Sequence, residues 1–146
     1  MHQLLKSVPI FAGLDEAAAN LFSEQAEKLT VPAGAVIARE GESNHSMYLI
    51  GKGSVRIVKH FGERDQTELA ILREKDFFGE MCILEPAPRA ATAQAVEPSI
   101  IFRVSSSAFH RLYKEMPAQY GILILNISRD LSRRLRRLDE VFAARH

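Results

Sequence analysis

The stretch from Ser46 to His60, SMYLIGKGSVRIVKH, contains two β-rich segments separated by a pair of glycines. Val55 and Ile57 alternate with Arg56, which is the pattern of a strand with one buried and one wet face. Three further β-rich runs, VPAGAVIAREGE, QTELAILR and SIIFRV, are bounded by turn signals such as Gly34, Gly41 and Gly62. Many short strands at close spacing predict a mainly β fold, an antiparallel β-roll of the jelly-roll type.

Helices are predicted on both sides of this β-rich region. Apolar residues recur at helical spacing from Leu14 to Leu29, and SSSAFHRLYKEM opens with serines able to cap a helix. A longer helix is predicted from about Pro117 to Ala143, with an apolar stripe that Arg134 interrupts: Tyr120, Ile124, Ile127, Leu131, Leu138 and Val141. The expected organisation is one domain, 1–146, with an N-terminal helical segment (1–30), a β-roll (31–104) and two C-terminal helices (105–146).

Composition restricts the class of protein. The 146 residues are 47% hydrophobic and 25% charged, as in a soluble globular domain, and the net charge of +1 gives no overall field that attracts nucleic acid or membrane. Cys82 is the single cysteine, so an internal disulfide is excluded and a reducing compartment fits best. The N-terminal residues lack the pattern of a signal peptide. We therefore expect a cytoplasmic protein with no membrane partner.

The stretch FFGEMCILEPAPRAAT, 77–92, carries the chemistry. Gly79 lets the backbone pass close to a ligand, and residues 80–84 can form one helical turn with free N–H groups at its start. Arg89 offers forked donors suited to a phosphate, while Glu80 fits if it accepts a hydrogen bond from a hydroxyl of the same ligand. On the residues alone, a solvated loop in which Glu80 and Arg89 form an ion pair is the alternative.

FGE, an apolar turn and PRAAT resemble the phosphate-binding cassette of the cyclic-nucleotide-binding domains, which include regulatory subunits of cyclic-AMP-dependent protein kinase and bacterial catabolite activator proteins. VPIFAGL, VPAGAVIAREGE, MYLIGKGSVRIV and the closing SRRLRRLDE also resemble that family. The resemblance extends over nearly the whole chain. It implies a cassette at 78–92 and a cyclic nucleotide as the ligand.

The resemblance also implies a role for each cassette residue. Glu80 would bind the ribose 2′-hydroxyl with Gly79 beside it, and Arg89 would bind the exocyclic phosphate oxygens. The backbone around four further residues would complete the anion pocket: Met81, Cys82, Ala90 and Ala91. Ala90 stands where members that prefer cyclic GMP often carry a threonine, so cyclic AMP is expected in preference to cyclic GMP.

A base pocket is implied by two alignments with the catabolite activator proteins. Aligning on DFFGE places Ile57, Leu69 and Ala70 at positions that line the nucleotide. Aligning on RRL places Leu138 and Asp139 where those proteins have a Thr-Ser pair that contacts adenine, which is a departure from the family pattern. Leu138 would then cap the purine and Asp139 would accept from its amino group. The alternative is that Leu138 packs in the helix core and Asp139 is solvated.

Other kinds of site find little support. No catalytic motif is present, so we expect no enzymatic activity and no cofactor. We also expect no metal, because the five histidines lack the spacing of metal ligands: His2, His45, His60, His110 and His146. Interleaved acids in the last helix favour a solvated face over nucleic-acid binding. The arginines of this helix are Arg129, Arg133, Arg134, Arg136, Arg137 and Arg145.

The sequence thus predicts a sensor domain in which a cyclic nucleotide biases an equilibrium between two arrangements. The C-terminal helices would move to cover the base, and the last helix would pass the change to a second copy or to a partner effector protein. Because the sequence ends at His146, we expect no DNA-reading domain of its own. Two alternatives are a module of the same fold that has lost its ligand and a DNA-associated regulator that uses the basic last helix.

Overall fold

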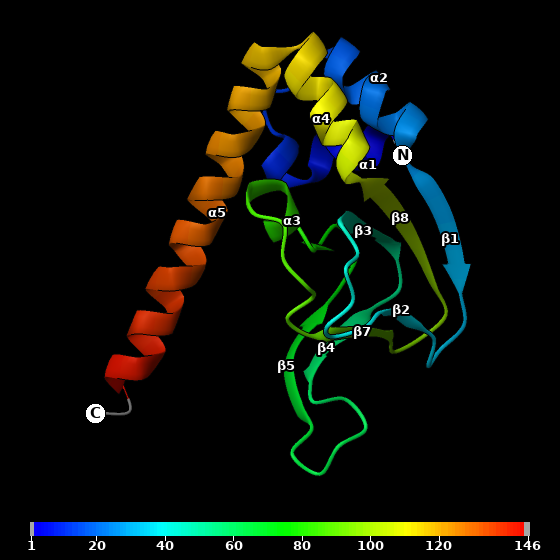
Figure 1. The fold of residues 1–146 in the computed structure, drawn as a ribbon, viewed down its shortest axis with the longest axis vertical. Coiled ribbons are helices and arrows are strands. Elements are labelled where there is room, and N and C mark those ends of the chain that lie inside the picture. Colours follow the sequence, from blue (N-terminus) through cyan, green and yellow to red (C-terminus); the bar gives the residue numbers. More distant parts are fainter. Residues whose placement is uncertain (1, 145–146) are drawn as a thin grey trace.

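A computed structural model describes residues 2–144 of the chain, so Arg145 and His146 lie outside the described residues. Helices from both ends of the sequence gather at one end of a β-roll (Figure 1). The helical elements are α1 (His2–Ser7), η1 (Pro9–Phe11), α2 (Glu16–Gln25), α3 (Met81–Leu84), α4 (Ser106–Glu115) and α5 (Pro117–Ala144). The strands are β1 (Glu27–Val31), β2 (Val36–Ala38), β3 (Ser46–Lys52), β4 (Val55–Lys59), β5 (Thr67–Leu72), β6 (Phe77–Phe78), β7 (Thr92–Ala95) and β8 (Ser99–Ser105).

The eight strands form two four-stranded sheets, which confirms the predicted antiparallel β-roll. One sheet has the order β1-β8-β3-β6 and the other β2-β7-β4-β5, and every pairing is antiparallel. The turn between β3 and β4 is one of the connections at which the chain changes from one sheet to the other. Gly53 occupies that turn with φ +96°, and a Cβ there would lie 2.9 Å from the carbonyl oxygen of Pro98. Glycine is therefore needed in this turn.

Strand β3 is buried on both faces, which explains its continuous apolar run. Met47 and Leu49 pack into a core shared with the helices, whereas Tyr48 and Ile50 pack into a second core within the roll. The helical core also holds a chain of aromatic contacts, in which the Phe22 ring centroid lies 5.1 Å from that of Phe11 and 5.1 Å from that of Phe109. Strand β3 therefore contributes side chains to both cores, and close packing couples the roll to the helices.

The predicted helix over 14–29 is wrong at its C-terminal end. Helix α2 begins after Asp15, whose side chain accepts a hydrogen bond from the amide of Ala18 at 2.9 Å, and it ends at Gln25. Leu29 instead lies in β1, where it pairs with Ile101 of β8. Its apolar side chain fits the helical period by coincidence, and pairing with a buried strand decides its conformation. The roll accordingly starts at Glu27 rather than at residue 31.

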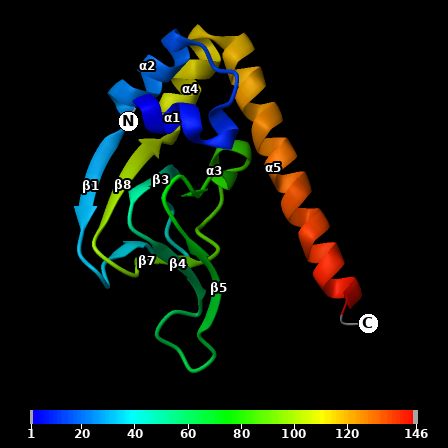
Figure 2. The same ribbon diagram turned by 180° about the vertical axis from the view of Figure 1, so that it is seen from behind.

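Helix α5 has two halves with different surroundings. Its first half packs against η1 and α4, with Leu123 and Ile127 fully buried. Its C-terminal end runs away from the roll, as both views show (Figures 1 and 2). Within residues 2–144, no helix has the length and apolar character needed to cross a membrane.

Candidate functional site

The cassette segment connects β6 to β7 and contains the predicted short helix, α3. Gly79 precedes it with φ +83°, in the left-handed region. A Cβ at this position would lie 2.8 Å from the carbonyl oxygen of Ser46 and would also meet the Nη1 atom of Arg89. The cassette therefore requires glycine here, and the guanidinium of Arg89 lies directly over it.

Glu80 is a buried acid, with only 2% of its surface exposed. Its Oε1 accepts a hydrogen bond from Nη1 of Arg134 at 2.7 Å, so a residue of α5 crosses to the cassette. Burial raises the pKa of Glu80, the Arg134 guanidinium opposes that rise, and the nearby Asp130 carboxylate adds to it. Glu80 is thus held as one partner of an ion pair between the roll and α5.

Arg134 is fixed by two further contacts. Its Nε lies 2.9 Å from Oδ2 of Asp130, close enough for an ion pair although the angle is too poor for a hydrogen bond. Its Cζ lies 5.5 Å from the centroid of the Phe77 ring, within the range of a cation–π contact. From the sequence, Arg134 is expected to be a break in an apolar stripe and one of the arginines of a solvated face. That break, at a position facing the roll, was the signal that could have identified it.

Arg89 does not pair with Glu80, so the alternative of a simple solvated ion pair is wrong. Its Nη2 donates to the carbonyl oxygen of Ser46 and lies 3.4 Å from Oδ1 of Asn44. Its Cζ lies 5.5 Å from the Tyr48 ring centroid. Its Nε is buried and has no acceptor among the described residues. Arg89 therefore keeps a desolvated donor available in the cassette.

Backbone hydrogen bonds hold both sides of Arg89. The amide of Gly41 donates to the Arg89 carbonyl at 2.8 Å, and the Arg89 amide donates to the Glu42 carbonyl at 2.9 Å. Lys59 Nζ donates to the carbonyl of Ala90 at 2.7 Å and lies 3.4 Å from Oε2 of Glu40. Lys59 could not be identified from the sequence, because the contact of Lys59 with the cassette depends on the pairing of β4 with β7.

The remaining cassette residues have mixed surroundings. Met81 is 54% exposed, Ala90 is exposed and Ala91 is half-buried. Cys82 is half-buried, and burial raises the pKa of its thiol, which suits a small packing residue and not a reactive thiolate. The amide of Cys82 points back to the Gly79 carbonyl at 3.4 Å. Its predicted contribution to an anion pocket would require that bond to be exchanged.

The predicted base-pocket residues fall into two separate sets. Ile57 and Ala70 are direct partners across β4 and β5, and Leu69 occupies the adjacent bulge with 58% of its surface exposed. Leu138 is 65% exposed and Asp139 is also exposed, both on the second half of α5. The structure brings the strand residues together but not the helix residues to them. The enclosed base pocket stays a prediction.

The family assignment rests on the whole fold together with this segment. The sequence model for the family described as "Cyclic nucleotide-binding domain" matches residues 28–116, more than half of the chain and all of the cassette. The chain belongs to the cyclic nucleotide-binding domain family.

Individual members of this family are similar over most of the domain. The cyclic AMP receptor protein of Thermus thermophilus is 30% identical over 136 residues, which cover 92% of this chain and 61% of that protein. A cAMP-dependent protein kinase regulatory subunit of Hypocrea atroviridis is 33% identical over 74% of this chain and 22% of its own length. The chain thus spans about three fifths of the Thermus relative.

Solved structures of family members agree with the fold. The sensor domain of the transcriptional regulator DNR from Pseudomonas aeruginosa superposes with a TM-score of 0.79 at 31% identity, covering 95% of this chain and 91% of that one. The Thermus thermophilus catabolite activator protein gives a TM-score of 0.76 at 29% identity, covering 92% of this chain and 62% of that one. Both matches include the β-roll and the flanking helices.

Proposed function

We propose that this domain binds cyclic AMP in the cassette and passes the binding event to α5. The observation that carries the proposal is the pair of side chains on either side of Gly79: a buried carboxylate at Glu80 and a guanidinium at Arg89 whose buried Nε has no acceptor among residues 2–144. A ligand with both an anion and a hydroxyl satisfies both groups. A ribose cyclic phosphate is such a ligand.

Arg89 would bind the phosphate. A guanidinium presents parallel donors that match two phosphate oxygens, and a desolvated donor without a partner is costly until it finds an acceptor. The carbonyl of Ser46 already accepts from Nη2, so the phosphate would replace that neutral acceptor with a charged one. The exchange strengthens the hydrogen bonds that the guanidinium makes.

Glu80 would bind the ribose hydroxyl. An ionised carboxylate accepts several hydrogen bonds, so Glu80 can receive a hydroxyl in addition to Arg134 or in its place. In either case the ligand changes the ion pair that joins the cassette to α5. Cyclic AMP is preferred to cyclic GMP because Ala90 carries no hydroxyl to bond a guanine.

Ligand binding in the cassette would change the position of α5 through Arg134. The ligand can shift the position of α5 only by its differential affinity for two arrangements, and the Glu80–Arg134 contact is where such a difference can arise. Weakening it frees the second half of α5 to approach the roll. Leu138 and Asp139 would then reach the base that Ile57, Leu69 and Ala70 face.

Calorimetric titration with cyclic AMP, cyclic GMP and 2′-deoxy cyclic AMP tests this proposal. We expect one site per chain, weaker binding of cyclic GMP, and a loss of about 10- to 100-fold for the deoxy analogue, as for one charge-assisted hydrogen bond. In the control variant Glu80→Gln the deoxy penalty should shrink. Absence of binding by all three nucleotides would favour the alternative of a module without a ligand.

We further propose that the second half of α5 pairs with the same helix of a second copy. Leu135, Leu138 and Val141 are 61%, 65% and 54% exposed on a helix half that projects from the roll. A run of large apolar side chains at this spacing is typical of a helix-to-helix contact. A self-complementary pair of helices would also carry movement from one copy to the next.

A charged substitution tests the pairing. Leu135→Glu is expected to shift the sedimentation profile from dimer toward monomer, since a carboxylate would be buried in an apolar seam. Arg136→Glu, one position along at an exposed site of the same helix, is the matched control and should leave the profile unchanged. A wild-type protein that is monomeric at tens of micromolar would refute the second copy as the partner.

A further inference from the structure

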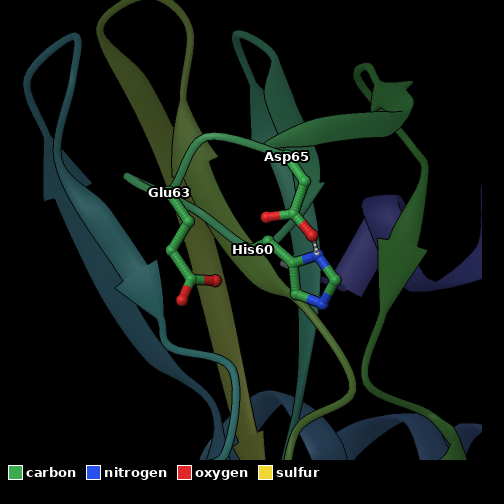
Figure 3. Close-up of side chains that lie close together, drawn as sticks. All are labelled: His60, Glu63 and Asp65. Carbon is green, nitrogen blue, oxygen red and sulfur yellow. Dashed lines mark ion pairs between the residues drawn. The ribbon is translucent and has the colours of Figure 1, made fainter.

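The loop between β4 and β5 gathers one imidazole and two carboxylates. One ligand atom each of His60, Glu63 and Asp65 lies within 4.8 Å of the other two. Figure 3 shows His60 paired with Asp65 and the Glu63 carboxylate set to one side of them. We propose that this loop binds a divalent transition-metal ion of the zinc class. The site is separate from the cassette and is a second ligand site of the domain.

The donor set selects the class of metal. Nitrogen from imidazole together with carboxylate oxygens suits zinc and its transition-metal neighbours, whereas magnesium and calcium take oxygen ligands. Zinc holds such atoms at about 2.0–2.2 Å, which places neighbouring ligand atoms roughly 3.4 Å apart in a tetrahedral site. His60 Nδ1 and Asp65 Oδ2 are 2.7 Å apart, so the ion would take the place of the proton between them, which is released to solvent, as the pair separates and Glu63 rotates toward it.

Hydrogen bonds from backbone amides already hold the loop that carries the three ligands. The amide of Glu63 donates to the His60 carbonyl at 3.0 Å, and the amide of Gln66 donates to the Glu63 carbonyl at 3.2 Å. The amide of Gly62 donates to Oε1 of Gln66 at 2.8 Å. The amide of His60 donates to Oε1 of Glu40 at 2.9 Å, which ties the loop to the roll. Little chain entropy therefore remains to be lost when an ion binds.

Charge in the loop favours a cation. Two basic residues of β4 have other partners: Lys59 contacts the Ala90 carbonyl and Glu40, and Arg56 Nε donates to Oε1 of Gln94 at 2.8 Å while its Cζ lies 5.8 Å from the Phe61 ring centroid. Glu63 and Asp65 thus face His60 with Arg64 as the one basic residue inside the loop. Three protein ligands leave at least one coordination position for water. We accordingly expect micromolar rather than nanomolar affinity.

No metal is expected from the sequence, because it contains no closely spaced pair of histidines. This set has a single histidine, and its two carboxylates lie three and five residues further along the chain. A histidine with φ +56° at the start of the turn, followed by Gly62 at φ +80°, brings these side chains to one side of the loop. That reversal cannot be read from residue spacing alone.

Calorimetry with Zn²⁺ and Mg²⁺ on tag-free, chelator-stripped protein tests the proposal. We expect Zn²⁺ to bind at one site and Mg²⁺ to give no heat of binding. His60→Asn keeps a residue that tolerates the left-handed conformation, and Asp65→Asn keeps the shape of the side chain; each should weaken Zn²⁺ binding at least tenfold. His110→Gln and Glu68→Gln remove an exposed imidazole and a β5 carboxylate outside the loop, and should change nothing.

Two results would overturn the proposal. One is a wild-type protein that does not bind Zn²⁺ at concentrations up to a millimolar. The other is equal Zn²⁺ affinity in wild type, His60→Asn and Asp65→Asn, which would assign any observed binding to histidines elsewhere. As a second readout, the ring resonances of His60 should shift on Zn²⁺ addition in an NMR titration, while those of His110 stay in place.

Discussion

Arg89→Ala is expected to weaken binding of cyclic AMP by at least about 100-fold, equivalent to about 2.7 kcal/mol. The substitution removes two charge-assisted hydrogen bonds to the phosphate, each contributing roughly 1.5–3 kcal/mol. Arg133→Ala, which removes an exposed guanidinium of α5, should change the affinity less than about twofold. Calorimetric titration of the three proteins makes the comparison.

Arg89 also has a structural role, so a second variant is needed. Its side chain donates to the Ser46 carbonyl and lies against the Tyr48 ring, and alanine loses both contacts. Arg89→Lys keeps the charge but not the forked donors, and should give an intermediate loss of affinity. Thermal melts establish whether each variant is folded. Equal affinities of Arg89→Ala and Arg133→Ala would contradict the cassette assignment.

Arg134→Gln is expected to lower the free energy of unfolding by about 2–3 kcal/mol at neutral pH, because it leaves the buried carboxylate of Glu80 without its cation. Urea unfolding at several pH values measures the effect. Arg133→Gln, at an exposed neighbouring position, is the control and should stay within about 0.5 kcal/mol of wild type.

The pH dependence of this loss has a definite sign. Burial raises the pKa of Glu80 in the folded protein, and removing Arg134 removes the group that opposes the rise. An acid whose folded pKa lies above its unfolded value destabilises the fold as pH increases through these two values. The Arg134→Gln penalty should therefore be largest at neutral pH and should shrink in acid as Glu80 takes up a proton. A penalty that is the same at all pH values would show that Arg134 acts through packing alone.

Much of the fold follows from local sequence signals. The glycine pair after SMYLI marked the turn between two strands, and Pro117 marked the boundary between α4 and α5. Helices α1 and η1 were missed, since MHQLLKSVPIF has no sustained period and folds because Leu5, Ile10 and Phe11 pack into the helical core. The end of α2 was also missed, because only pairing with β8 makes Leu29 a strand residue.

The candidate site was predictable where its residues are close in sequence. Gly79, Glu80 and Arg89 belong to one segment, and their chemistry is visible in the order of the residue types. Arg134 lies 54 positions from Glu80, and their contact depends on the direction that α5 takes past the cassette. Residue types cannot supply that direction. The same limit applies to Lys59 and the Ala90 carbonyl, which are joined by the order of strands in a sheet.

A crystal structure of the domain with cyclic AMP tests the central claim most directly. We expect the guanidinium of Arg89 to leave the Ser46 carbonyl for the exocyclic phosphate oxygens, and the carboxylate of Glu80 to accept the ribose 2′-hydroxyl. Helix α5 should move toward the roll, with Leu138 against the base. A nucleotide bound away from Gly79, or one bound in the cassette with the Arg89 and Glu80 contacts unchanged, would contradict the account.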